Sequence, residues 1–154
     1  MERKTTNIIF IALSMALVLA SFISNPAIGD ANPQKNSNDL QIIARAVNGE
    51  ARGEPYEGQV AVAAVILNRV RHPSFPNTIA GVIYQPGAFT AVADGQINVP
   101  IAADTTVFKA CEAAISGWDP SSGAIYYYNP QTATSQWIFS RETIKTIGRH
   151  RFAR

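Results

Sequence analysis

The sequence predicts an α-rich α+β fold in a single domain, with a small β element near its C-terminal end. Three observations carry this prediction. The run from Val60 to Leu67 contains no polar residue, apolar residues recur at helical spacing before and after it, and β-branched and aromatic residues gather only after Ala124. A length of 154 residues also fits one domain.

The first 29 residues have the pattern of an export signal. Basic residues at Arg3 and Lys4 precede an uncharged stretch over residues 8–23, and small residues near Ala27 suit a cleavage site. The stretch is also nearly long enough to be an uncleaved membrane anchor. Either alternative places the remaining residues outside the cytoplasm, so an exported protein is expected.

Residues 30–37 contain proline and several polar side chains, which is typical of a linker. The folded domain is therefore expected over residues 38–154. It contains a single cysteine and cannot form an internal disulfide, so its core must be stable without one.

The charge pattern and the residue counts exclude several kinds of partner and site. The net charge is only +2 and most basic residues are scattered, so no nucleic-acid partner is expected. Two histidines and one cysteine do not make a zinc site of the usual spacing, and no glycine-rich phosphate loop is present. The sequence therefore predicts neither a metal nor a cofactor.

The first expected helix begins with a capping-box pattern at Asn38 and Gln41 and runs to about Arg52. Gly53 then suits the position that follows a helix. Gly49 lies inside this helix, where glycine costs about 1 kcal/mol relative to alanine. Its presence there indicates close approach by another backbone or by a substrate.

A second helix, over residues 57–70, is apolar nearly all round, so we expect it to be buried at the centre of the domain. A short helix over residues 79–83 follows, capped by Asn77 or Thr78. Residues 87–100 then form a long irregular segment, and such segments are commonly functional.

Asp104 is expected to cap a third long helix, with Cys111 buried on its apolar face rather than exposed as a nucleophile. After it, residues 124–128 read as a strand, and residues 137–139 and 150–152 are two further extended candidates. Glu142 is expected on a solvated helix face.

Glu50 is the carboxylate whose position suits chemistry best. It lies in the last turn of the first helix, where the helix dipole disfavours a negative charge. Burial there would favour the protonated form that a general acid for a glycosidic oxygen requires. The structural alternative is that Glu50 and Glu54 form ion pairs with Arg45, Arg52 or Arg69.

These residues resemble a known family. The run 43–55, with Gly49-Glu50-Ala51-Arg52-Gly53-Glu54, and the helix that ends in Asn68-Arg69 are similar to the catalytic domain of the spore cortex-lytic enzymes, the SleB-type cell-wall hydrolases. The similarity covers essentially all of residues 38–154 and continues through Phe75-Pro76, Gln85, Phe89-Thr90, Tyr126 to Pro130, Ile147-Gly148, His150 and Phe152.

The resemblance implies a lysozyme-like domain that degrades cell-wall peptidoglycan. In that family the glutamate matching Glu50 is the catalytic acid. The reaction is lytic transglycosylation between N-acetylmuramic acid and N-acetylglucosamine, which leaves a 1,6-anhydro end. The implied substrate is spore cortex containing muramic δ-lactam, degraded during germination. The implied location is the cortex, the outer side of the inner membrane, or the cell wall, with a membrane-associated partner protein. A monomer is expected.

The other candidate residues would line a groove for the glycan strand. They are Glu54, Gln59, Phe89, Thr90, Tyr127, Asn129 and Trp137. The polar ones can hydrogen-bond sugar hydroxyl or acetamido groups, with turn or cap positions as their alternative. The aromatic ones can stack on sugar faces, with core positions as their alternative. Alternation along the strand favours Tyr127 over its two tyrosine neighbours.

Two rival functions stay open at this point. A muramidase would cleave the same bond with water and would need a second carboxylate, for which Asp94 is the candidate. The alternative for Asp94 is a turn before Gly95. A transglycosylase needs only Glu50, first as an acid and then as a base. The other rival is a wall-binding protein without turnover.

Overall fold

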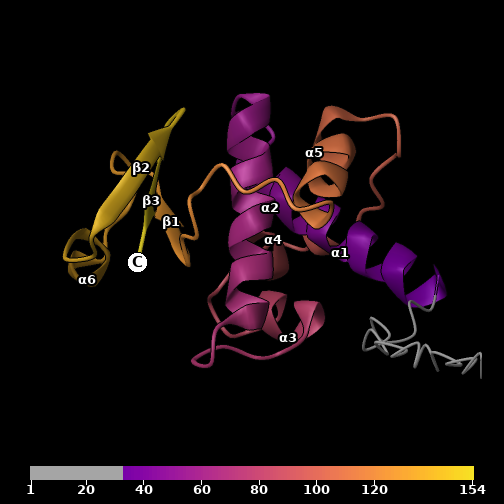
Figure 1. Cartoon of the computed structure of the whole chain (residues 1–154), viewed down its shortest axis with the longest axis horizontal. Coiled ribbons are helices and arrows are strands. Elements are labelled where there is room, and N and C mark those ends of the chain that lie inside the picture. Colours follow the sequence, from indigo (N-terminus) through magenta and orange to yellow (C-terminus); the bar gives the residue numbers. More distant parts are fainter. Residues whose placement is uncertain (1–32) are drawn as a thin grey trace, which may run out of the picture. The chain divides into compact units, whose positions relative to one another are not determined.

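Helix α2 (Tyr56–Arg71) forms the centre of the domain because its sequence offers no polar face. The computed structural model describes residues 33–154, and within them every residue from Gly58 to Ile66 is buried. A helix that is apolar all round must be covered all round. Its neighbours are α1 (Pro33–Ala51), α3 (Ile79–Ile83), α5 (Thr106–Ile115) and strand β1 (Tyr126–Tyr128) (Figure 1). The prediction of a buried central helix is confirmed.

Helix α1 begins earlier than the sequence predicts. Its first turns cover residues 33–37, which the sequence pattern assigns to a linker, so the capping box at Asn38 and Gln41 is wrong. Gln41 instead exchanges two hydrogen bonds with the backbone of Ile101. Its Nε2 donates to the carbonyl oxygen at 2.8 Å, and its Oε1 accepts from the amide at 3.3 Å. The helix ends at Ala51, as the stop signal at Gly53 indicates.

The predicted leader over residues 1–29 lies outside the described residues, and the domain boundaries at 30 and 38 stay predictions. Across residues 33–154, every helix is too short or too polar to cross a bilayer.

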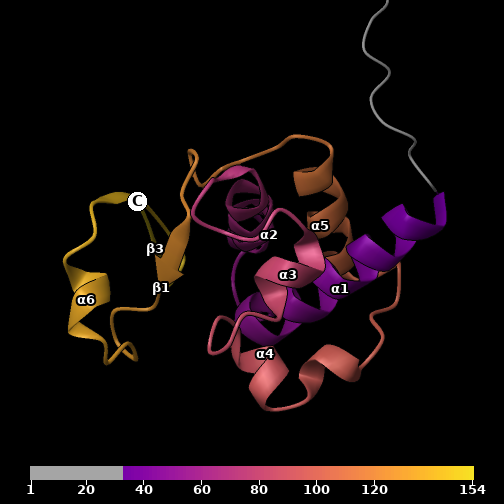
Figure 2. The ribbon, with the colours of Figure 1, turned by 90° about the horizontal axis from the view of Figure 1, so that it is seen from below.

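The segment between α3 and α5 is more ordered than the sequence suggests. Thr78 caps α3, since its Oγ1 accepts a hydrogen bond from the amide of Gly81 at 3.0 Å. Residues 87–100 then contain the short helix α4 (Thr90–Ala93) and the 3-10 helix η1 (Gln96–Asn98). Figure 2 shows α4 beside the C-terminal end of α1.

The cap of α5 is Thr105 rather than Asp104, so that prediction is wrong by one residue. The Oγ1 atom of Thr105 accepts from the amide of Phe108 at 3.2 Å. Threonine in the β conformation and a carboxylate are both good caps, and the turn preceding the helix decides which one is in position. Cys111 is fully buried on the inner face of α5, as expected.

The C-terminal part forms a three-stranded antiparallel sheet in the order β1-β3-β2. Strand β3 (His150–Ala153) is the middle strand, and β2 (Thr143–Ile147) is its other neighbour. The side chain of Phe152 on β3 is fully buried and joins the core of the helices. The predicted strands near 124–128 and 150–152 are confirmed.

Two predictions for this region are wrong. Residues 137–139 belong to the one-turn helix α6 (Gln136–Phe139), although their apolar and aromatic content favours a strand. Glu142 lies directly before β2 and belongs to no helix.

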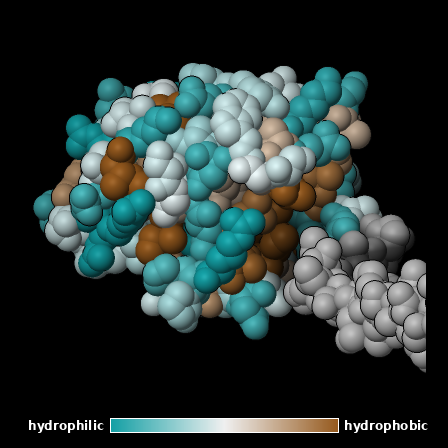
Figure 3. Space-filling model, in the orientation of Figure 1, coloured by the Kyte–Doolittle hydropathy of each residue, from teal (hydrophilic) through white to brown (hydrophobic). Residues whose placement is uncertain are grey.

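The surface has apolar patches as well as charge. Figure 3 shows a largely hydrophilic face with apolar residues exposed where α1, α2 and α5 meet. Leu40, Leu67, Ile79 and Ile115 line a groove of about 430 Å³ in this part of the molecule.

Candidate active site

A pocket of about 400 Å³ opens between the end of α1, the start of α4 and the sheet. It brings together residues from both ends of the domain. Its walls are formed by Gly49, Glu50, Glu54, Thr90, Tyr127, Tyr128, Asn129, Thr132, Ala133, Arg149 and His150. Of the predicted site residues, Glu50, Glu54, Thr90, Tyr127 and Asn129 therefore meet in one place.

The Glu50 carboxylate is held by the first turn of α4. Its Oε1 accepts hydrogen bonds from the amide of Thr90 at 2.6 Å and from the amide of Ala91 at 3.3 Å. The first amides of a helix have no partner within the helix, so a carboxylate oxygen satisfies them well. This arrangement fixes one oxygen of the Glu50 carboxylate at the wall of the pocket.

The Tyr127 phenol is a second contact of Glu50, because its side chain hydrogen-bonds the Glu50 carboxylate. Burial raises the pKa of Tyr127 well above its ordinary value, and the nearby Glu50 charge raises it further. The phenol therefore stays protonated and acts as a neutral donor beside the carboxylate. Tyr127 also contacts the ring of His150, with the two ring centroids 5.4 Å apart.

Gly49 explains how α4 comes close enough to hold Glu50. A Cβ atom at position 49 would lie only 2.5 Å from the Cβ of Ala91. Only glycine leaves room for this contact between α1 and α4. The prediction of a close backbone approach at Gly49 is confirmed.

Glu54 has a different role from Glu50. Its carboxylate accepts from the backbone amide of Arg149 at 2.8 Å and from Nε of the same residue at 2.7 Å. Burial acts to raise the pKa of Glu54, but these hydrogen bonds outweigh it and hold the pKa below its ordinary value. The carboxylate stays ionised, and its partner is Arg149 rather than Arg45, Arg52 or Arg69.

Gly148 makes room for this pair. Its φ is +56°, and a Cβ atom there would collide with Oε2 of Glu54. The turn between β2 and β3 therefore carries glycine, which lets the Arg149 backbone approach the carboxylate closely.

Arg69 lies behind the pocket wall, where the sequence suggests only a possible ion-pair partner for Glu50 or Glu54. It reads as a cation at the end of α2, yet it is buried, and its Nε donates to the carbonyl oxygen of Ile125 at 2.7 Å. Its guanidinium lies over the rings of Phe75, Phe89 and Tyr126, at 5.2, 5.6 and 5.8 Å from their centroids. Burial lowers its pKa, while Tyr127, Tyr126 and Glu50 oppose that shift. Arg69 thus places a positive charge behind Glu50 and Tyr127.

Three of the predicted site residues lie away from this pocket. Phe89 is only 3% exposed, so it takes the core position that was the alternative to the groove, and its ring packs against Arg69. Gln59 is also buried, and its Nε2 donates to the carbonyl oxygen of Glu54 at 3.0 Å. Gln59 therefore supports the chain between α1 and α2 from inside.

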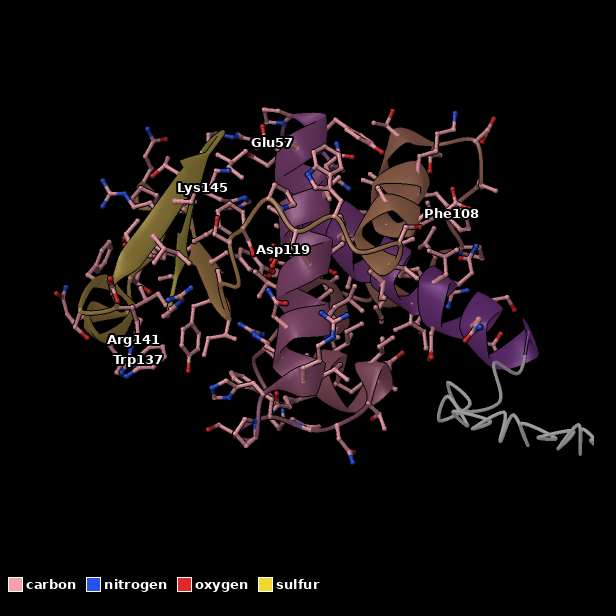
Figure 4. The ribbon with its side chains drawn as sticks, viewed as in Figure 1. Glu57, Phe108, Asp119, Trp137, Arg141 and Lys145 are labelled. Atoms are coloured by element: carbon pink, nitrogen blue, oxygen red, sulfur yellow. The ribbon has the colours of Figure 1, made fainter. Side chains whose placement is uncertain are left out.

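Trp137 is half exposed and lines a second pocket of about 290 Å³. Tyr126 and Tyr127 line that pocket too, so the two pockets adjoin at Tyr127. The guanidinium of Arg141 lies 4.4 Å from the centre of the Trp137 ring, and the two side chains lie together near α6 (Figure 4). We call this second hollow the aromatic pocket.

Asp94 takes the turn position that the sequence offers as its alternative to a catalytic role, and His150 lies in the wall of the pocket. Asp94 accepts from the amide of Gln96 at 3.0 Å and from its side-chain nitrogen at 2.6 Å, so it stabilises the turn at Gly95 and does not line the pocket. His150 is buried, not at the surface, and burial lowers its pKa.

The comparisons with known proteins agree with this geometry. Residues 53–153 match the Cell Wall Hydrolase family. The chain is 60% identical over 119 residues to a spore cortex-lytic enzyme of Bacillus cereus. That match covers 77% of this chain and 45% of the relative, so the chain spans less than half of the length of that protein.

Two solved structures share the fold. One is the catalytic domain of the Bacillus cereus SleB protein, at 61% identity and a TM-score of 0.73, covering 77% of this chain and 91% of that one. The other is the catalytic domain of the germination-specific lytic transglycosylase SleB from Bacillus anthracis, at 62% identity and the same TM-score, covering 76% and 94%. The α-rich, lysozyme-like α+β prediction is confirmed, and the chain belongs to the cell wall hydrolase family.

Proposed function

We propose that the chain is a peptidoglycan lytic transglycosylase in which Glu50 is both the general acid and the general base. One observation carries the proposal. Glu50 faces the pocket, and α4 fixes one of its carboxylate oxygens. Glu54 is the other carboxylate among the described lining residues, and it forms an ion pair with Arg149. One free carboxylate is what a one-acid mechanism uses.

The reaction consists of two proton transfers through the same carboxyl group. Glu50 first gives its proton to the glycosidic oxygen, and the bond between that oxygen and C1 of the muramic acid breaks. The Glu50 carboxylate then takes the proton from the 6-hydroxyl group of the muramic acid, while the oxygen of this hydroxyl attacks C1. The products are a 1,6-anhydro end and a free 4-hydroxyl, and Glu50 regains its proton.

The relatives support this choice, since the matched SleB of Bacillus anthracis is described as a germination-specific lytic transglycosylase and the Bacillus cereus relative as a spore cortex-lytic enzyme. For this chain we propose spore cortex peptidoglycan as the substrate, export across the membrane as a monomer, and action at the cortex or wall. A membrane-associated partner protein belongs to the same proposal.

The aromatic pocket supports binding of a sugar chain beside Glu50. An exposed indole ring such as that of Trp137 offers an apolar face to the C–H groups of a sugar ring. Tyr127 lines both pockets, so we propose that a glycan strand bound near Glu50 extends toward Trp137.

Hydrolysis by a muramidase has less support. It requires a second carboxylate that activates water, and the candidate Asp94 is engaged by Gln96 outside the pocket. Product mass spectrometry separates the two reactions, because transglycosylation leaves anhydro ends and hydrolysis leaves reducing ends.

The deciding variant is Glu50→Gln, which keeps an acceptor for Thr90 but cannot transfer a proton. Purified Glu50→Gln should fold normally and release no soluble fragments from peptidoglycan. Glu112→Gln, at an exposed position on α5, is the matched control and should retain activity. Full release by Glu50→Gln would overturn the proposal, and binding without release by the native chain would identify a wall-binding protein.

A further inference from the structure

A third pocket, of about 230 Å³, shares a wall with the pocket around Glu50. It is lined by Asn129, Pro130, Gln131, Thr146, Gly148, Arg149 and Arg151. Asn129 and Arg149 line both hollows, so a ligand in the first pocket can reach into this one. We call it the arginine pocket.

The sheet fixes the position of Arg151. This residue lies on the middle strand β3, directly opposite Tyr128 on β1 and Thr146 on β2. Directly opposed residues of neighbouring strands project from the same face of a sheet. Arg151 is therefore held in a row of three side chains, one from each strand, beside the loop that carries Asn129.

The charge of the arginine pocket is positive. Its lining contains two arginines and no carboxylate. Arg149 already shares its charge with Glu54, and Lys145 pairs with Glu57 at 3.6 Å. Across residues 33–154, Arg151 has no carboxylate within salt-bridge distance; its side chain hydrogen-bonds the Tyr128 phenol. An exposed guanidinium among neutral polar groups suits a carboxylate ligand.

We propose that the arginine pocket binds a carboxylate carried by a muramic acid residue of the glycan strand, with Arg151 as its main ligand. The inference rests on the proposed function. Peptidoglycan sugars are neutral except for the lactyl group of muramic acid, which ends in a carboxylate or continues into the stem peptide. A muramic δ-lactam has no such group, because its lactyl carboxyl is closed into a ring amide. The pocket therefore distinguishes substituted muramic acid from the lactam.

The test compares the variants Arg151→Gln and Arg151→Lys with the native chain. Arg71→Gln is the control, because Arg71 is exposed and lines the distant apolar groove. The substrates are glycan strands with stem peptides, the same strands after an amidase has removed the peptides, and amidase-treated strands whose carboxylates are coupled to methylamine.

We expect Arg151→Gln to raise KM about three- to fivefold on carboxylate-bearing strands, as for an exposed ion pair, with little change in kcat. Arg151→Lys should restore most of the difference, and the amidated strands should not distinguish the variants. An effect confined to peptide-bearing strands assigns the carboxylate to the stem peptide, and an effect confined to amidase-treated strands assigns it to the lactyl group. An effect on both shows that the pocket accepts either carboxylate. Equal KM values for Arg151→Gln and native protein on every strand would overturn the inference.

A binding assay separates this inference from the proposed function. In the Glu50→Gln background, which removes the proposed acid, the domain and its Arg151→Gln derivative are sedimented with insoluble peptidoglycan. Weaker sedimentation of the derivative supports the arginine pocket whether or not the native chain turns over. Turnover by Glu50→Gln would contradict the mechanism alone, and equal sedimentation would contradict the pocket alone.

Discussion

The Oε1 atom of Glu50 lies 2.6 Å from the backbone nitrogen of Thr90, forty residues further along the chain. This hydrogen bond joins the end of α1 to the start of α4, so the carboxylate is oriented before any substrate binds. The position of Glu50 therefore depends on how α4 packs against α1.

Shortening the side chain tests this orientation. Glu50→Asp keeps the carboxyl group but withdraws it by one methylene from the amides of Thr90 and Ala91. We expect kcat to fall about 100-fold, because misplaced acid–base groups lose most of their effect. The measurement is the rate of fragment release, with circular dichroism to confirm the fold. A rate near that of the native chain would mean that the α4 contact does not position the acid.

The contact between Gly49 and Ala91 provides a second test. Gly49→Ala places a methyl group 2.5 Å from the Cβ of Ala91, so we expect a loss of about 1–3 kcal/mol in unfolding free energy and a lower kcat as α4 moves away. Adding Ala91→Gly removes the colliding methyl and should restore part of both quantities. Urea unfolding and fragment release measure them. Without any rescue in the double variant, another contact must cause the loss.

The Glu54–Arg149 pair makes stability depend on pH. The pKa of Glu54 in the folded chain lies below its ordinary value of 4.5, so the ionised form stabilises the fold. This contribution is complete above that value and is lost as the pH falls through the lower folded pKa. The difference in unfolding free energy between native and Glu54→Gln should therefore be larger at about pH 7 than at about pH 3.

Glu112→Gln, on the exposed face of α5, is the control and should leave the unfolding free energy close to that of the native chain at both pH values. A Glu54→Gln difference that does not change with pH would show that the carboxylate charge adds nothing to the fold.

The Cys111 thiol should be unreactive in the folded protein. It is fully buried, and burial, with a smaller effect of Glu112, raises the pKa of its thiol to about 12. An aromatic disulfide reagent should label it only after urea unfolds the chain, and fragment release should survive the treatment. The variant Cys111→Ala, which lacks the thiol, gives the background signal. Rapid labelling of the native protein would contradict the buried position.

Trp137 should contribute to substrate binding rather than to the chemical step. Removing its half-exposed ring with Trp137→Ala should raise KM about tenfold with a small change in kcat, as for loss of one stacking contact. Trp118 is similarly exposed but does not line the aromatic pocket, so Trp118→Ala is the matched control. Equal KM values in both variants would show that Trp137 does not contact the substrate.

The sequence predicts the parts of this domain whose signals are local. The burial of α2 is predicted correctly from its run of apolar residues, and one of the two candidate caps of α3, Thr78, is the observed cap, because cause and effect lie within a few residues. Glu50 also stands out locally, as a carboxylate in the last turn of its helix, and the structure places it in the pocket. Whether it is the acid stays a prediction.

The remaining parts depend on contacts between distant residues. The partner of Glu54 is 95 residues away, and the local sequence around either residue does not predict the ion pair. Phe89 looks exposed in its polar, glycine-containing segment, but the buried guanidinium of Arg69 gives its ring a place in the core. The sequence analysis expects Glu142 on a helix face and does not predict strand β2, whose conformation depends on pairing with the distant strand β3.

The middle strand of the sheet, β3, is synthesised after both of its neighbours. Strands β1 and β2 do not pair with each other, so no sheet can form until the ribosome has delivered His150 and the residues after it. Arg149, the partner of Glu54, emerges in the same interval. The part of the pocket wall that Arg149 and His150 form is therefore completed only after β3 has been synthesised, and a nascent chain that has not reached Arg149 contains Glu50 without this part of the wall.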